Sequence, residues 1–177
     1  VVKEFERYTI TGMTGVNTLY NALLNFEPFQ KTNWSKLQFV AAGGTALQKS
    51  VAEAWKKLTD QDISEGYGMT EASPVVTSNP HGKTKLGSVG VPVPSTDVRI
   101  VDEGGKVLEQ GDTGEIQVKG PQVMKGYYNK PEETAKTLTS DGWLNTGDIG
   151  LIDEEGYLKI VDRKKDMILV SGFNVYP

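Results

Sequence analysis

The sequence predicts an α/β layered sheet in its first half and a mainly antiparallel β part in its second half. Up to about residue 67, apolar stretches that fit strands alternate with apolar stripes at helical spacing, which is the pattern of layered α/β folds. Between residues 79 and 95, frequent prolines and glycines interrupt any regular spacing of apolar residues. After residue 95 the apolar period switches to two, as in half-buried strands. We therefore predict two parts, residues 1–85 and residues 86–161.

Helices and strands alternate in the first part. The first helical stripe consists of Val16, Leu19, Tyr20, Leu23 and Leu24. The apolar run 37–42 then predicts a buried strand that enters a tight turn at Gly43 and Gly44. A second amphipathic stripe predicts a helix at 46–59. A short strand at about 62–67 is expected to follow it.

The second part is predicted to contain antiparallel strands and one helix. One strand lies around 98–100, and residues 115–119 alternate strictly between apolar and polar. Residues 149–153 and 157–162 flank a turn and predict a hairpin. Pro131, followed by two glutamates, begins a helix at 131–139. Such strands form either a small barrel or a sandwich.

Composition excludes several classes of function. The 177 residues contain 19 Lys and Arg and 23 Asp and Glu, so the net charge is 19 − 23 = −4. A net negative charge disfavours binding to nucleic acid through a general attraction between basic side chains and phosphates. Because there is no cysteine and only one histidine, His81, disulfides, thiolate metal sites and histidine-rich metal sites are excluded. Glycine is abundant, at 20 of 177 residues against an expected share of about 7%, which indicates many turns or many close backbone approaches.

Residues 66–71 are the first candidate site. As structure alone, they fit a strand that ends in a glycine turn, with Thr70 capping the next element. As a site, they offer the aromatic face of Tyr67 to a planar group such as a purine, while flanking glycines let the backbone approach a ligand. Thr70 can donate to a phosphate oxygen, and the Glu71 carboxylate suits Mg²⁺. The candidates are Gly66, Tyr67, Gly68, Met69, Thr70 and Glu71.

Three weaker candidates lie elsewhere. Asp148 follows a glycine, which fits an ordinary turn, but its two carboxylate oxygens can also accept from the hydroxyls of a ribose. Gly43 and Gly44 end a predicted strand before a helix, where open α/β sheets bind ligands, yet they lack a phosphate-loop pattern. Arg163 belongs to the charged run 162–166, and such runs are usually solvated surface. The Arg163 guanidinium could instead neutralise phosphate oxygens.

These motifs follow one another along a single chain, and in that order and spacing the sequence resembles the adenylate-forming superfamily. This superfamily includes acyl-CoA synthetases, luciferases and the adenylation domains of peptide synthetases. Three stretches are similar to bacterial long-chain fatty-acid–CoA ligases in particular, namely 65–71, 118–127 and 160–177. The resemblance extends over essentially the whole chain.

The resemblance implies a two-step reaction. A fatty carboxylate attacks the α-phosphorus of ATP to give an acyl-adenylate and pyrophosphate, and the CoA thiol then displaces AMP. It implies that Tyr67 stacks on adenine beside Gly43 and Gly44, and that Asp148 binds the ribose hydroxyls. It further implies that Thr70 binds the α-phosphate, that Glu71 holds Mg²⁺ and that Arg163 contacts ribose or phosphate. Lys165 would lie where the small C-terminal domain pivots between the two half-reactions. Thr70, Glu71 and Lys165 are the expected catalytic set.

The resemblance also implies that the chain is an internal fragment of a larger N-terminal domain. Residues 86–161 would then be its β-barrel subdomain, and 162–177 the hinge and the start of a C-terminal domain. The family's phosphate loop and its C-terminal adenylation lysine have no counterpart in these 177 residues. We therefore expect the chain alone to lack ligase activity and to bind ATP weakly.

Two alternatives remain open. The first is another adenylate-forming enzyme that acts on a medium-chain, aryl or amino acid, and the second is a non-catalytic β-rich binding module. A cytoplasmic location is expected from the resemblance, with peripheral contact to the inner face of the membrane, although no basic amphipathic helix supports that contact. The oligomeric state is left open, with a homodimer as one alternative.

Overall fold

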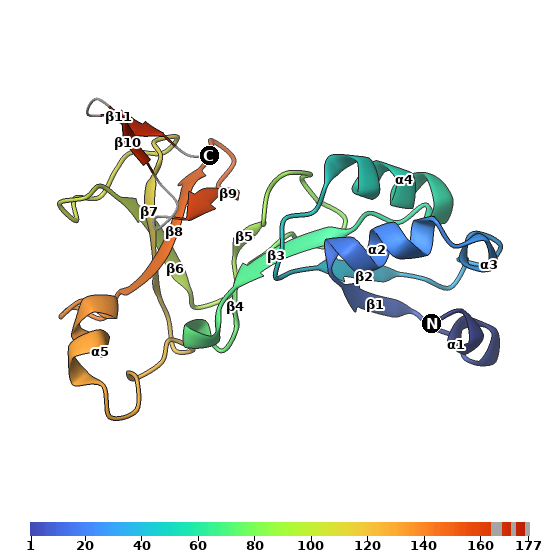
Figure 1. Ribbon diagram of the computed structural model, residues 1–177, viewed down its shortest axis with the longest axis horizontal. Helices are drawn as coiled ribbons and strands as arrows, with labels where there is room; N and C mark the ends of the chain where they lie inside the picture. The colour runs from blue at the N-terminus through green and yellow to red at the C-terminus, as the bar shows by residue number, and fades with distance from the viewer. Residues whose placement is uncertain (164–167, 171–172, 176–177) are drawn as a thin grey trace.

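The computed structural model describes residues 1–163, 168–170 and 173–175. It is elongated, with an α/β part at one end and an antiparallel sheet at the other (Figure 1). Strands β3 (Ser64–Gly68) and β4 (Val75–Ser78) extend from the first part toward the second. In the described part of the chain, no helix is both long and apolar enough to cross a membrane.

The first sheet is mixed and has the order β1-β2-β3-β4-β5. Strands β1 (Gly12–Gly15), β2 (Phe39–Ala42) and β3 run parallel to one another. Strand β4 is antiparallel to β3, and β5 (Val91–Pro92) is antiparallel to β4. The predicted α/β sheet is thus confirmed for β1 to β3, where helices connect the strands, while the short return through β4 makes the rest antiparallel.

An aromatic cluster joins the helices of the first part to the sheet. The helices are α1 (Val2–Arg7), α2 (Asn17–Leu24), α3 (Glu27–Gln30) and α4 (Lys49–Thr59). The Tyr20 and Trp55 rings of α2 and α4 meet edge to face at 4.8 Å, and Phe29 lies 5.6 Å from Trp55. All three side chains are fully buried. The Tyr20 hydroxyl donates to the backbone oxygen of Ala41 at 2.6 Å, which fixes α2 on β2.

The second part is a four-stranded antiparallel sheet of order β6-β7-β8-β9. Its strands are β6 (Asp97–Val101), β7 (Gly114–Lys119), β8 (Leu144–Ile152) and β9 (Leu158–Arg163), and α5 (Pro131–Thr137) precedes β8. A second apolar core packs on this sheet and also takes in Ala72 and Val76. A separate hairpin of β10 (Ile168–Val170) and β11 (Phe173–Val175) follows.

Two predictions about the fold need correction. The predicted helix 46–59 begins at Lys49, because the Leu47 N–H donates to Glu65 Oε1 (3.1 Å) and the Gln48 N–H donates to Asn17 Oδ1 (2.9 Å), which holds these residues outside the helix. In the described strands the second sheet is open, with β6 and β9 at its edges, so no closed barrel is present there. Four strands are fewer than the roughly five of even a small barrel.

The sequence patterns missed several short elements. These are α1, α3, β1, β4, β5 and the 3₁₀ turn η1 (Thr70–Ala72). All are six residues or shorter, and unlike the alternating run 115–119 their sequences show neither a clear alternation nor a helical stripe. The predicted boundaries at residues 85/86 and 161/162 remain predictions.

Candidate active site

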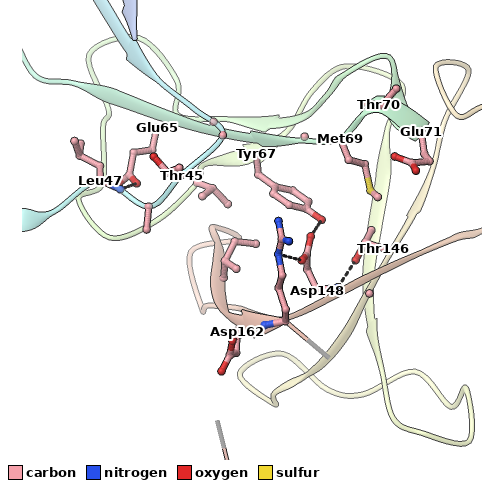
Figure 2. A pocket seen from close by; sticks show the side chains of 18 of the residues that line it. Thr45, Leu47, Glu65, Tyr67, Met69, Thr70, Glu71, Thr146, Asp148 and Asp162 are labelled. Carbon is pink, nitrogen blue, oxygen red and sulfur yellow. Dashed lines mark hydrogen bonds and ion pairs between the residues drawn. The ribbon is translucent and has the colours of Figure 1, made fainter. Parts of the chain in front are cut away.

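One cavity of about 1270 Å³ lies between the two parts of the molecule. Three segments supply most of its wall, namely 44–47 after β2, 65–71 from β3 and η1, and the facing ends of β8 and β9 (Figure 2). Gly87 and Val89 of the loop between β4 and β5 complete it. The cavity therefore gathers residues that lie more than 100 positions apart in the sequence.

Tyr67 and Asp148 meet inside this cavity (Figure 2), and Arg163 lines it as well. The Tyr67 hydroxyl donates to Asp148 Oδ2 at 2.5 Å, and Arg163 Nε lies 3.6 Å from Asp148 Oδ1. The Asp148 side chain is 17% exposed and that of Arg163 is 63% exposed. Burial, reinforced by the hydrogen bond to Asp148, raises the pKa of Tyr67, so this hydroxyl stays protonated.

An irregularity in β8 just before Asp148, where the pairing of β8 with β7 shifts register, fixes the direction of its carboxylate. The Asp148 N–H donates to Thr146 Oγ1 (3.1 Å), and that hydroxyl donates to the Ile116 carbonyl on β7 (2.8 Å). Gly147 between them has φ +72°, a conformation that favours glycine. Thr146 therefore acts as a brace for Asp148, a role that the sequence analysis did not assign.

Thr70 and Glu71 lie further along the wall of the same cavity, on η1. The Thr70 residue is exposed. The Glu71 carboxylate accepts a hydrogen bond from the Tyr127 hydroxyl at 2.8 Å, and its carbonyl accepts one from the Met124 N–H at 2.8 Å. The bond to Glu71 raises the pKa of Tyr127. Tyr127, which lies 56 positions away in the sequence, thus orients the predicted magnesium ligand.

Of the predicted glycines, Gly44, Gly66, Gly68 and Gly147 line the cavity, whereas Gly43 is not part of its wall. A Cβ on Gly68 would lie 2.0 Å from the Pro74 carbonyl oxygen, and a Cβ on Gly66 would lie 3.1 Å from that of Thr77. The close backbone approach at Gly66 and Gly68 is therefore made by β4 and by Pro74 immediately before it. This gives both glycines a structural reason that the sequence analysis did not identify.

Two acidic residues of the cavity were missed. Glu65 is buried at 7% exposure, and its Oε1 accepts the Leu47 N–H; burial raises its pKa, while backbone hydrogen bonds from Leu47 and Gly87 oppose that shift. Asp162 also lines the cavity, and its Oδ2 has no hydrogen-bond partner among the described residues. An acidic residue inside a predicted buried strand was the available signal for Glu65.

The described wall of the cavity is strongly acidic. The side chains of this wall that carry a formal charge are Glu65, Glu71, Asp148, Asp162 and Arg163, which are four negative charges and one positive charge. Within residues 1–163, 168–170 and 173–175, no cluster of three or more metal-binding side chains occurs. Glu71 nevertheless fits Mg²⁺, which proteins commonly hold by one or two carboxylates together with substrate phosphates. Lys165, the remaining predicted catalytic residue, lies outside the described residues.

Comparison with known proteins identifies the family to which this chain belongs. The model of the family described as AMP-binding enzyme matches residues 1–128. The chain belongs to the AMP-binding enzyme family. The resemblance predicted from the motifs is thereby confirmed, and the Tyr67 and Glu71 segments both fall within the matched residues.

Relatives within the AMP-binding family include long-chain-fatty-acid–CoA ligases. The chain is 57% identical to the Yersinia pestis ligase and 47% identical to the Bacillus subtilis ligase, and in each comparison about the whole chain matches 32% of the relative. It thus spans about a third of the curated relatives. Among solved structures, the chain is similar to ATP-bound MatB from Rhodopseudomonas palustris, with a TM-score of 0.90 and 39% identity over 99% of this chain and 35% of that one. It is also similar to the anthranilate CoA ligase AuaEII in complex with anthranoyl-AMP, with a TM-score of 0.90 and 30% identity over 99% of this chain and 34% of that one.

Proposed function

We propose that the complete protein is an AMP-forming long-chain fatty-acid–CoA ligase. The observation that carries this proposal is one cavity in which Tyr67, Asp148 and Arg163 meet and whose wall continues to Thr70 and Glu71. The identity of 57% to a long-chain-fatty-acid–CoA ligase supports the choice of substrate.

Adenosine fits the end of the cavity that holds Tyr67. The ring of Tyr67 would stack on adenine, with Gly44 along its edge, whereas Gly43 lies outside the cavity wall. The Asp148 carboxylate would accept hydrogen bonds from the two ribose hydroxyls, because Tyr67 and Arg163 occupy only part of its acceptor capacity. Arg163, which is mostly exposed, can turn toward ribose or phosphate, while Asp148 keeps the hydrogen bond from Tyr67.

The other end of the cavity suits the reacting phosphate. An oxygen of the fatty carboxylate attacks the α-phosphorus, and the bond from that phosphorus to the pyrophosphate oxygen breaks. Thr70 would donate to the α-phosphate, and Glu71, oriented by Tyr127, would hold Mg²⁺, which supplies neutralisation of phosphate charge. The CoA thiolate then attacks the acyl carbon, and AMP leaves with the electron pair of the broken acyl–oxygen bond. The step depends on positioning and on neutralising charge, so it needs no histidine base.

Acid-dependent pyrophosphate exchange by the full-length protein tests the proposal. Exchange that is strongest with long-chain fatty acids supports it. Preference for aryl acids would favour the alternative of an aryl ligase, to which the 39% identity with a feruloyl-CoA synthase from Amycolatopsis also points. Absence of exchange with every acid contradicts an adenylate-forming function.

Substitution of Asp148 tests the ribose assignment. Asp148→Ala in the full-length protein is expected to raise the KM for ATP at least about tenfold, because two hydrogen bonds to a charged group are lost, at about 1.5–3 kcal/mol each. Asp97→Ala, at an exposed position of β6 outside the cavity, is the matched control and is expected to leave KM unchanged. An unchanged KM for ATP and an unchanged kcat in Asp148→Ala would refute the assignment.

The proposal includes CoA and Mg²⁺ as ligands, a cytoplasmic location and peripheral contact with the inner face of the membrane. The last two are carried over from the resemblance. Cell fractionation measures both, and a protein found entirely in an extracellular or integral membrane fraction would contradict them.

A further inference from the structure

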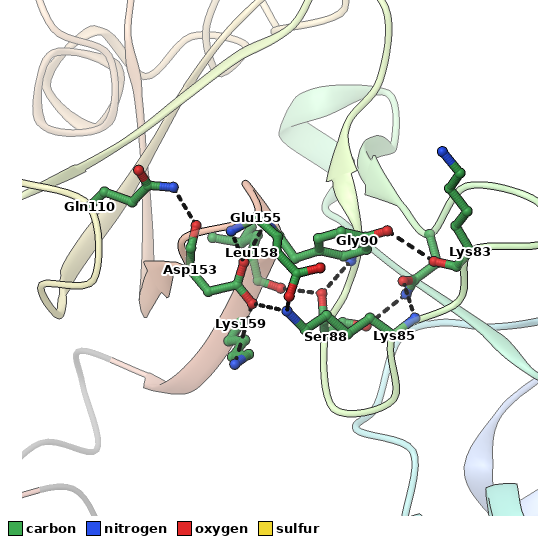
Figure 3. A network of polar contacts seen from close by, with 11 residues as sticks. Lys83, Lys85, Ser88, Gly90, Gln110, Asp153, Glu155, Leu158 and Lys159 are labelled. Carbon is green, nitrogen blue, oxygen red and sulfur yellow. Dashed lines mark hydrogen bonds and ion pairs between the residues drawn. The ribbon is translucent and has the colours of Figure 1, made fainter.

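The loop 79–90, between β4 and β5, joins the two walls of the cavity (Figure 3). It carries Gly87 and Val89, which line the cavity between the β3 wall and the β8–β9 wall. The loop therefore has the right place to control how far apart the two walls lie.

Asn79 ties the loop to the β3 wall. It is 4% exposed. Its side-chain amide donates to the Glu65 carbonyl at 3.0 Å and to the Ser88 carbonyl at 2.7 Å, while its Oδ1 accepts the Lys85 N–H at 2.9 Å. One buried side chain thus connects β3 to both halves of the loop.

Backbone hydrogen bonds tie the same loop to β9. The Val89 N–H donates to the Leu158 carbonyl at 2.9 Å, and the Leu158 N–H donates to the Gly90 carbonyl at 2.8 Å. The Ser88 hydroxyl adds a bond to the Leu158 carbonyl at 3.0 Å. These contacts hold the start of β9, but they do not reach the turn that joins it to β8.

Lys85 reaches that turn (Figure 3). Its Nζ lies 2.8 Å from Asp153 Oδ2 and 2.5 Å from Glu155 Oε1, and the Tyr157 hydroxyl donates to the Lys83 carbonyl at 3.0 Å. The side chains of Lys85 and Asp153 are 31% and 13% exposed, so this pair is better shielded from water than an ordinary surface pair.

Asp153 connects Lys85 to the rest of the β8–β9 hairpin through its own contacts. Its Oδ1 accepts the N–H groups of Glu155 (3.1 Å) and Tyr157 (3.0 Å), and its Oδ2 also lies 3.4 Å from Lys159 Nζ. Its carboxylate is therefore fixed within the turn. From Asp153, β8 runs back five residues to Asp148, roughly 16 Å away at the rise of an extended strand.

We propose that Lys85 and Asp153 are positioning residues that clasp the β8–β9 wall to the loop 79–90, and that this clasp sets the affinity of the cavity for the adenine nucleotide. The inference rests on the proposed function. Neither side chain lines the cavity, so the clasp acts through the placement of Asp148 and Arg163 opposite Tyr67.

Lys85→Met in the full-length protein, probed with AMP by calorimetry and with ATP by pyrophosphate exchange, tests the clasp. The Kd for AMP and the KM for ATP are each expected to rise about fivefold, with the KM for CoA and kcat at saturating ATP unchanged. Lys85→Arg is expected to restore most of the affinity. Asp153→Asn should behave like Lys85→Met, and the double variant should be no weaker than either single variant.

Lys31→Met is the matched control, because Lys31 forms an exposed ion pair with Glu27 away from the cavity. Glu155→Gln is the milder second variant should Lys85→Met not fold, with an expected rise of about twofold in the Kd for AMP. The clasp is overturned if the folded Lys85 and Glu155 variants have an unchanged Kd for AMP. It is also overturned if the KM values for all substrates rise equally. Absence of AMP binding by the unmodified protein overturns the proposed function itself and the clasp with it.

Discussion

Asp148 shows how little of a site residue's role depends on that residue alone. Its carboxylate is aimed by the Thr146 hydroxyl and the left-handed Gly147, and it is held between Tyr67 and Arg163. The predicted role of Asp148 came from its place after a glycine in a short motif. The brace through Thr146 to the Ile116 carbonyl could not be predicted, because it depends on the register of β7 against β8.

Gly68 is a residue whose substitution tests packing within the site. Gly68→Ala is expected to destabilise the protein by about 1–3 kcal/mol, because the added Cβ would lie 2.0 Å from the Pro74 carbonyl oxygen and β4 would have to move. Denaturant unfolding of the full-length protein measures the change.

Gly12→Ala is the control for that experiment. Gly12 also lies in a strand, but a Cβ there would find its nearest neighbour, the Phe39 carbonyl oxygen, at an ordinary 3.8 Å. A loss of stability no greater for Gly68→Ala than for Gly12→Ala would show that β4 does not constrain position 68.

At the scale of elements, long periodic segments were predicted well and short ones were not. The helical stripe near residues 16–24 and the hairpin of β8 and β9 appear in the structure, although β8 begins at Leu144, five residues before the predicted start. The predicted helix at 131–139 is also present, although it ends at Thr137. Strand β4 was missed because its two valines are followed by Thr77 and Ser78, so its sequence does not alternate between apolar and polar residues.

The turn between β8 and β9 is expected to make stability depend on pH. The Lys85 ammonium, together with the N–H groups of Tyr157 and Glu155, lowers the pKa of Asp153 from 3.8 to about 2. A carboxylate with a depressed folded-state pKa stabilises the fold above its unfolded pKa, and this contribution is lost as the pH falls toward the folded value. The difference in melting temperature between the unmodified protein and Asp153→Asn should therefore be constant above about pH 4 and shrink below it.

The Lys85→Met background provides the control for this pH dependence. Lys85 is the largest cause of the depressed pKa of Asp153, so the shrinkage below about pH 4 should weaken in that background. A melting-temperature difference that does not change with pH in either background would contradict the assignment of the shift to this ion pair.

At the scale of the whole molecule, the site depends on the meeting of two separate apolar cores. One core is built on Tyr20, Phe29 and Trp55, and the other on Ile116 and Leu144. The Tyr67–Asp148 bond and the Lys85–Asp153 pair both connect segments that lie 68 or more positions apart. Loss of either core would therefore be expected to open the cavity.

The 177-residue chain alone is expected to form no acyl-adenylate. Its described cavity wall carries four acidic groups against one basic group, so it cannot neutralise a triphosphate unaided, and it spans about a third of the long-chain-fatty-acid–CoA ligases that it matches. Pyrophosphate exchange measures this, with the full-length protein as the positive control. Strong exchange by the chain alone would show that the described wall suffices.

The family of the chain could be predicted from the sequence, because short motifs at set spacing reflect local chemistry, and the same motifs supplied the candidate site residues. Tyr67, Thr70, Glu71 and Asp148 were selected in this way, and all line the cavity. The clasp through Lys85, the brace on Glu71 from Tyr127 and the crowding at Gly68 emerged only from the tertiary structure. Each joins side chains or backbone across strand pairings and loops, and the packing of the two cores decides such contacts where local periodicity carries no signal.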